Sequence, residues 1–256
     1  MDEAASTERT AGEMSLGDHF RELRSRLLKA LLALVAGTAV GYALFPWILE
    51  LLIAPYCNLP QELTAGDCSL VALRPLEPFS VRIRTSLVIG LFVAGPVIFF
   101  QLWRFITPGL TRRERRWSLP FVVLSQLMAA CGILFAYFVI PTALAVLLSL
   151  GGPQITPLLS ATEYLSFFLT MCLAFALVFE VPLVLISLTF VGVVSASGLR
   201  RARPYAVVSM TIAAAIVTPT TDAVTLLLVA GPLWLFYELS VLTAWLIGRR
   251  REKKTQ

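Results

Sequence analysis

The sequence is poor in charged residues. Only 14% of its 256 residues are Asp, Glu, Lys or Arg, against about 25% in an ordinary soluble domain. So few charges cannot cover a surface that faces water, which excludes a soluble enzyme and a disordered chain. Hydrophobic residues make up 57% of the sequence and lie in long unbroken runs, whereas a transmembrane β-barrel shows alternating apolar and polar residues. The composition therefore predicts a polytopic helical membrane protein.

The sequence also lacks the residues of intramembrane catalysis. Its single histidine, His19, precedes the first apolar run. One histidine cannot supply the H-E-x-x-H motif of a zinc protease, and at this position it cannot act as the base for a serine nucleophile within the bilayer. No G-x-S-x-G motif and no Walker motif occurs. We therefore expect no enzyme activity, no metal site and no cofactor.

Stretches without charge predict where the chain crosses the membrane, because a charge at mid-bilayer costs roughly 2.5–3.5 kcal/mol. A crossing takes about 20 residues. One all-α membrane domain is predicted over residues 18–248, and residues 1–17 and 249–256 are predicted to be a disordered N-terminal segment and a basic tail. Six transmembrane helices are predicted, at about 27–49, 85–103, 118–139, 164–190, 205–217 and 223–247.

The lysine and arginine residues predict the orientation of these helices. Of the 21 basic residues, 18 fall in the N-terminal segment, the second and fourth loops and the tail, and 3 fall in the first loop. Basic residues are retained on the cytoplasmic side, so both termini are predicted to be cytoplasmic. The net charge of +5 is explained by topology and requires no nucleic-acid partner.

The first extracytoplasmic loop contains several prolines, Pro55 among them, and two of the four cysteines, Cys57 and Cys68. Both cysteines lie on the oxidising side of the membrane, where a disulfide between them is allowed. Prolines restrict the backbone. The composition leaves open whether this loop is a stiffened connector or a structured cap that braces the outer ends of the helices.

Two acidic residues stand out on the predicted cytoplasmic surface. Glu22 lies in an amphipathic stretch before the first span, and Glu114 lies among four arginines in the second loop. Local charge pairing is one interpretation, with Arg26 as the partner of Glu22 one helical turn away. The other interpretation is that the two carboxylates receive a ligand with two guanidinium groups, since arginine binds carboxylates in a planar, bidentate way that lysine cannot reproduce.

A third acid, Glu180, lies in the middle of the fourth predicted span. An acid at this depth must face protein, water or a partner. One interpretation is a hydrogen bond to a neighbouring helix, and the other is a functional site within the membrane.

Several short segments, taken in order, resemble the TatC family, the polytopic core of the Sec-independent twin-arginine translocase. The likeness runs from about residue 15 to residue 247. It is carried by residues 19–24, 54–55, 105–110, 114–116, 135–138, 174–182 and 203–205.

This resemblance implies a concave, groove-like bundle in a bacterial-type plasma membrane, acting as a receptor without enzyme activity. Such a protein binds twin-arginine signal peptides at the cytoplasmic face. It then exports folded cargo with single-span TatA-like and TatB-like partners, driven by the proton-motive force. The resemblance also implies contact with membrane lipid and a homo-oligomer within the complex.

By position, the resemblance implies roles for individual residues of this sequence. The residues implied for signal-peptide binding are Glu22, Arg24, Phe105 and Glu114. The residues implied for the intramembrane polar site and partner docking are Glu180, Asp222 and Thr225. Pro55 is implied to belong to the outer cap. Two other classes remain open on the residues alone. One is a secondary transporter that uses Glu180 as a proton-coupled site, and the other is a lipid-facing scaffold without a signal-peptide site.

Overall fold

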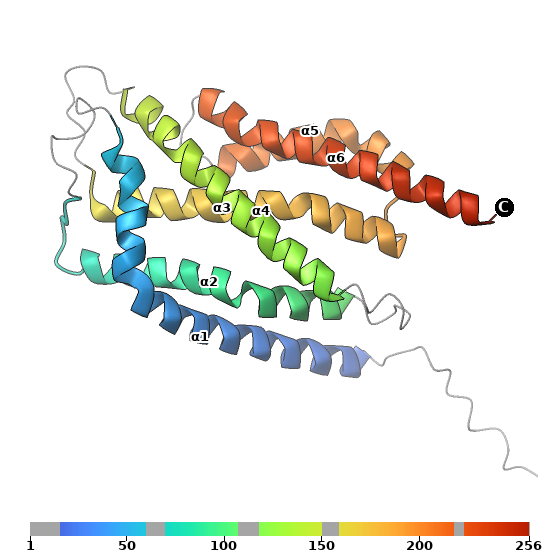
Figure 1. The fold of residues 1–256 in the computed structure, drawn as a ribbon, viewed down its shortest axis with the longest axis horizontal. Coiled ribbons are helices and arrows are strands. Elements are labelled where there is room, and N and C mark those ends of the chain that lie inside the picture. Colours follow the sequence, from blue (N-terminus) through green and yellow to red (C-terminus); the bar gives the residue numbers. More distant parts are fainter. Residues whose placement is uncertain (1–15, 60–69, 107–117, 150–158, 218–222, 256) are drawn as a thin grey trace, which may run out of the picture.

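The computed structural model describes residues 16–59, 70–106, 118–149, 159–217 and 223–255. The described residues form six α-helices and, between helices, one isolated parallel β-bridge. Figure 1 shows the helices, which are α1 (Leu16–Cys57), α2 (Glu77–Ile106), α3 (Ser118–Ser149), α4 (Ala161–Val191), α5 (Ala196–Val217) and α6 (Ala223–Thr255). The predicted all-α class with six helices is confirmed.

Five of these helices, α1 to α4 and α6, contain a stretch long and apolar enough to cross a membrane. α5 is not one of the five, because Arg200, Arg201 and Arg203 all lie in its N-terminal part. The apolar remainder of α5 covers residues 205–217, the short fifth span that the charge pattern predicts.

The helices extend beyond the predicted spans. α1 ends only at Cys57, so the first part of the predicted outer loop is helical. α3 continues past Pro141 to Ser149, although the proline and glycine content suggested a loop there. α6 continues through the basic segment to Thr255. Proline is tolerated inside membrane helices because neighbouring groups satisfy the freed backbone carbonyls, and for this reason Pro141 does not mark the end of α3.

α1 is a bent helix, and Figure 1 shows its C-terminal part turning away from the direction of α2. This part contains Pro46 and Pro55, and a proline inside a helix removes a hydrogen bond and clashes with the preceding turn. The bend brings the end of α1 to the beginning of α4. There the Tyr164 hydroxyl donates a hydrogen bond to the carbonyl oxygen of Leu52 at 2.6 Å, so α4 holds the bent end of α1 in place.

α4 is the central helix of the bundle and contacts α2, α3, α5 and α6. Its inward face carries large side chains at helical spacing, among which Tyr164, Phe168 and Phe175 are fully buried. Because i, i+4 and i+11 positions share one face of a helix, these side chains form a single stripe. The main core cluster is built around that stripe.

The first residues of α1 and the last residues of α6 lie at the same end of the bundle in Figure 1. The C-terminal ends of α2 and α4 and the N-terminal ends of α3 and α5 lie at this end as well. Most of the described basic residues lie in these helix ends. Six helices that run in alternating directions thus bring the helix ends next to the predicted cytoplasmic segments to the same end of the bundle.

α1 and α2 approach so closely that their backbones touch. A Cβ atom added to Gly37 would lie 2.5 Å from the carbonyl oxygen of Gly90, and one added to Gly41 would lie 2.5 Å from the carbonyl oxygen of Ser86. The two glycines of α1 are four residues apart, and so are Ser86 and Gly90 on α2. This is the small-xxx-small pattern that lets membrane helices pack at short range.

The substitution Gly37→Ala should therefore destabilise the protein. The new methyl group would meet backbone atoms, which cannot rotate away, and overpacking of this kind costs about 1–3 kcal/mol. The readout is the apparent melting temperature of the purified protein in detergent, which should fall. Gly231→Ala on α6 is the matched control, because nothing lies within 4 Å of a Cβ atom there. An equal fall for both variants would contradict the assignment of a tight α1–α2 contact.

Candidate functional site

A cavity of about 390 Å³ lies where the N-terminal part of α1 passes the C-terminal end of α2. It belongs to the end of the bundle that the basic residues predict to be cytoplasmic. The side chains that line it are Arg21, Glu22, Ser25, Arg26 and Lys29 from α1 and Gln101 and Arg104 from α2. We refer to it as the inner cavity.

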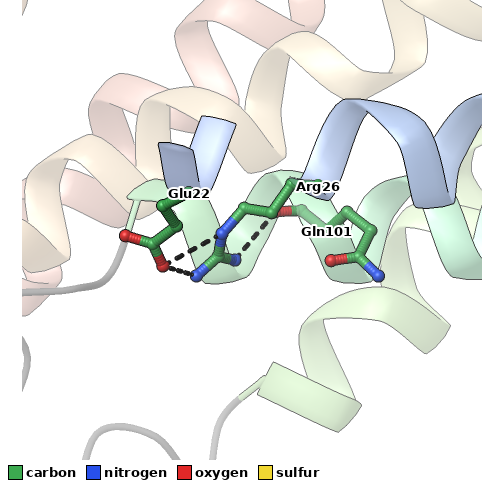
Figure 2. Close-up of polar contacts among 3 residues, drawn as sticks. All are labelled: Glu22, Arg26 and Gln101. Atoms are coloured by element: carbon green, nitrogen blue, oxygen red, sulfur yellow. Dashed lines mark hydrogen bonds and ion pairs between the residues drawn. The ribbon is translucent and has the colours of Figure 1, made fainter. Parts of the chain in front are cut away.

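Glu22 and Arg26 form an ion pair in the wall of the inner cavity, one turn apart on α1. The Nε atom of Arg26 donates to Oε1 of Glu22 at 3.1 Å, and its Nη2 atom donates to the same oxygen. The Nη1 atom donates to the backbone carbonyl oxygen of Gln101 on α2 at 3.4 Å, and Figure 2 shows all three residues. Arg26 thus holds the Glu22 carboxylate and ties α1 to α2.

This ion pair is partly shielded from water. The side chain of Arg26 is 11% exposed and that of Glu22 is 27% exposed. The pairing with Arg26 agrees with one of the two interpretations of Glu22. The contact with Gln101 was missed, because it joins residues 75 positions apart and no local pattern indicates it.

Of the other three residues implied for signal-peptide binding, the structure describes the side chain of one, Arg24. Arg24 is exposed on α1 and does not line the inner cavity. Phe105 lies in the last turn of α2, and the placement of its side chain is not described. Glu114 lies outside the described residues. The pairing of Glu22 with Glu114 as a two-carboxylate site therefore stays a prediction.

Glu180 is half-buried in the middle of α4. Its Oε1 atom is buried and has no hydrogen-bond partner among the described residues. α3 carries two further buried oxygens without a hydrogen bond of normal geometry, Ser125 Oγ and Gln126 Oε1, and the Ser125 hydroxyl lies next to the Glu180 carboxyl. Buried polar atoms without partners are rare, because each loses its hydration without compensation. This part of the bundle is the second candidate site, within the membrane span.

The opposite end of the bundle is held by a buried carboxylate that sequence reasoning missed. Glu77, at the beginning of α2, is 6% exposed. One oxygen accepts the backbone N–H of Thr162 in the first turn of α4 at 2.8 Å. The other accepts the backbone N–H groups of Leu73 at 2.7 Å and Arg74 at 3.2 Å. An acid in the first turn of a helix is common, so the sequence does not distinguish this brace from an ordinary helix start.

The described end of the first outer loop is bonded to α4. Val71 pairs with Ser160 in the β-bridge, and its carbonyl oxygen accepts the backbone N–H of Ala161 at 3.0 Å. Ser160 also caps α4, because its hydroxyl accepts the backbone N–H of Glu163 at 3.2 Å. Pro55 is buried. The loop residues next to α2 therefore brace the outer ends of the helices, while the role of Pro55 itself stays a prediction.

The remaining predicted residues are described incompletely. Cys57 is disulfide-bonded, but Cys68 lies outside the described residues, so the bond between these two stays a prediction. Asp222 lies outside them as well, and for Thr225 in the first turn of α6 the side chain is not described. Within the described ranges, no three His, Cys, Asp or Glu side chains gather as metal ligands would.

A family model described as "Sec-independent protein translocase protein (TatC)" matches residues 18–232. The chain belongs to the TatC family. The resemblance carried by the short segments is confirmed, and the TatC family is a family of transport components rather than enzymes. The chain is thus a multi-pass membrane protein and a component of the twin-arginine translocase.

Two TatC relatives illustrate the similarity. The Sec-independent protein translocase protein TatC of Frankia casuarinae is 41% identical over 93% of this chain and 67% of its own length. The protein of the same name from Corynebacterium kroppenstedtii is 36% identical over 90% of this chain and 61% of its own length. The chain therefore spans about two thirds of the length of these two relatives.

The fold is that of a solved TatC structure. A crystal structure described as the twin arginine translocase receptor TatC matches with a TM-score of 0.76 and 39% sequence identity. The match covers 89% of this chain and 98% of that one. The TatC fold thus accounts for the arrangement of helices around both candidate sites.

Removing the Glu77 carboxylate should loosen the outer end of this TatC bundle. In Glu77→Ala, three backbone N–H groups lose their acceptor, and a buried donor left unsatisfied costs about 1–3 kcal/mol. The apparent melting temperature in detergent should fall, and cleavage in the first outer loop by an added protease should become faster. Glu163→Ala is the matched control, because Glu163 is an exposed acid in the first turn of α4. Wild-type behaviour of Glu77→Ala in both measurements would refute the brace.

Proposed function

We propose that this chain is the signal-peptide receptor of a twin-arginine translocase. It binds twin-arginine signal peptides at the cytoplasmic face of a bacterial plasma membrane and assembles with single-span TatA-like and TatB-like subunits. The complex exports folded proteins and is driven by the proton-motive force. Family membership and the solved relative described as a twin arginine translocase receptor support this proposal.

The observation that carries the proposal is that the Glu22 carboxylate already binds a guanidinium group. Arg26 contacts Glu22 through two nitrogens in a half-buried position beside a cavity. An arginine of an incoming peptide offers the same planar donors, so it can take the place of Arg26 on the carboxylate. The net cost of this exchange is small, since one charge-assisted contact replaces another of the same kind.

The second arginine of the peptide is assigned to Glu114. This acid follows Arg104, which lines the inner cavity, by ten positions in the sequence. Two carboxylates distinguish a pair of arginines from a pair of lysines, because only the guanidinium fork makes two parallel hydrogen bonds to each carboxylate. We also assign Arg24 and Phe105 to the binding of the same peptide.

The partner subunits are assigned to the intramembrane site. Glu180 is half-buried in the middle of α4, and its Oε1 atom has no hydrogen-bond partner among the described residues. We assign a single-span partner helix to the surface beside it. A polar side chain on that helix gains a hydrogen bond there that no lipid tail can offer. Thr225 and Asp222, near the beginning of α6, are assigned to the same docking, and further copies of the chain complete a homo-oligomer.

Changing Glu22 should weaken recognition of the twin-arginine motif. In Glu22→Gln the charge is lost while the shape is kept, and a hydrogen bond to a charged group contributes about 1.5–3 kcal/mol. The affinity for a fluorescent twin-arginine signal peptide should therefore fall roughly tenfold or more. Binding is measured by fluorescence anisotropy with the purified protein in nanodiscs, and Glu114→Gln should give a loss of similar size.

Three controls make this measurement specific. Glu163→Gln removes an exposed acid at the opposite end of the bundle and should bind the peptide normally. A peptide with lysine in place of both arginines should bind wild type as weakly as the twin-arginine peptide binds Glu22→Gln. In Arg26→Gln the internal competitor is gone, so the twin-arginine peptide should bind at least as tightly as to wild type. Normal binding by a Glu22→Gln, Glu114→Gln double variant would refute the receptor assignment.

Changing Glu180 should weaken partner docking while leaving peptide binding intact. Glu180→Leu removes both oxygens from the intramembrane site, whereas Glu180→Gln keeps one acceptor and a similar volume. The yield of site-specific crosslinks between α4 and a TatB-like partner in native membranes should therefore fall more for Glu180→Leu than for Glu180→Gln. Equal crosslinking by wild type and Glu180→Leu would exclude Glu180 as a docking point.

A further inference from the structure

The inner cavity has a charge balance opposite to the one that an arginine ligand requires. Four of its lining residues are cationic, namely Arg21, Arg26, Lys29 and Arg104, and one is acidic. The acid, Glu22, is engaged by Arg26. A cavity with this excess of positive charge attracts an anion.

Three of these cations have no partner within the described part of the chain. Arg21, Lys29 and Arg104 are exposed, and none of them makes a hydrogen bond or ion pair to another described residue. Arg26 is committed on two sides, to Glu22 and to the carbonyl oxygen of Gln101. Like charges lining one cavity repel each other, so an anion bound among the three would relieve this repulsion.

Phosphate is the anion that suits these donors best. Arginine presents a planar fork that matches two phosphate oxygens, and lysine adds a compact point charge. The three side chains come from two helices, with Arg21 and Lys29 on α1 and Arg104 on α2. A volume of about 390 Å³ accommodates a phosphate group together with a small organic substituent.

The surroundings of the cavity favour a phosphate that belongs to a lipid. On the same part of α1, Leu23, Leu27 and Leu28 are exposed, and on α2 Leu102, two residues before Arg104, is exposed. In a membrane protein such side chains contact acyl chains. Basic cavities between helices at the cytoplasmic side bind anionic lipid headgroups in this way.

We propose that the inner cavity binds the phosphate group of an anionic phospholipid from the cytoplasmic leaflet, held by Arg21, Lys29 and Arg104. The site lies beside Glu22 but does not use its carboxylate. The proposal therefore does not depend on the signal-peptide assignment, and the two are measured separately.

The test is a lipid titration followed by native mass spectrometry of the purified full-length chain in detergent. Phosphatidylglycerol and phosphatidylcholine with the same acyl chains are added to wild type, and the lipid-bound fraction is counted. Wild type should retain phosphatidylglycerol in clear preference to phosphatidylcholine. In Arg21→Gln, Arg104→Gln the affinity for phosphatidylglycerol should fall roughly tenfold to thirtyfold, since each basic residue contributes about 1 kcal/mol to binding an anionic lipid.

The matched control is Arg200→Gln, Arg201→Gln. It removes the same charge from two exposed arginines on α5 at the same end of the bundle and should bind phosphatidylglycerol as wild type does. An equal loss in both double variants would show general attraction to surface charge and would overturn the site. Equal binding of the two lipids by wild type would overturn it as well.

Inorganic phosphate separates the two sources of the phosphate group. Millimolar phosphate added to wild type together with phosphatidylcholine should leave the apparent melting temperature unchanged, whereas phosphatidylglycerol should raise it. Stabilisation by inorganic phosphate equal to that by phosphatidylglycerol would overturn the lipid assignment. The melting temperatures of the double variants without added lipid check that both variants are folded.

Discussion

The cost of placing a charge in hydrocarbon is the constraint on which the rest of this structure depends. It confines most of the described basic residues to one end of the bundle and leaves the middle of each long helix apolar, except for Glu180 on α4. The helices must satisfy their own backbone hydrogen bonds in that environment, which explains why they continue through Pro46, Pro141 and similar positions. Because the cations are collected at one end, the inner cavity, which lies at that end, is lined mainly by cationic side chains.

The geometry of that cavity follows from how closely α1 and α2 pack. The backbone contacts at Gly37 and Gly90 set the distance between the helices. About three turns toward the cytoplasmic end, the same pair of helices carries Arg26 and Gln101. A close approach fixes the guanidinium of Arg26 between a carboxylate on its own helix and a carbonyl oxygen on the next. The Glu22–Arg26 pair is thus positioned by glycines that lie well inside the membrane span.

The helices and their number could be predicted because charge-free runs report directly on bilayer depth, and the Glu22–Arg26 pair could be predicted because it is local to one helix. The carbonyl of Gln101 and the brace at Glu77 could not, since both depend on which helices become neighbours. α1 continues to Cys57, beyond the predicted span, because the charge of Glu50 ends the charge-free run but not the helix. For Glu114 the sequence predicts a role, because it is an acid among four arginines. Its position lies outside the described residues, so the predicted role is not tested.

Glu77, Glu22 and Glu180 lie at different depths of the bundle and differ in their hydrogen-bond partners. This difference distinguishes an acid that stabilises the fold from the acids proposed to bind a ligand or a partner. Glu77 is buried and bonded to three backbone N–H groups, which cannot leave without unfolding the outer end. Glu22 is bonded to a side chain, and a guanidinium on a flexible stem can be exchanged for another. Glu180 keeps one buried oxygen without a partner among the described residues. A carboxylate held by backbone groups, as Glu77 is, stabilises the fold. The proposed function therefore assigns the ligand and the partner helix to Glu22 and Glu180, whose bonds can be exchanged or are incomplete.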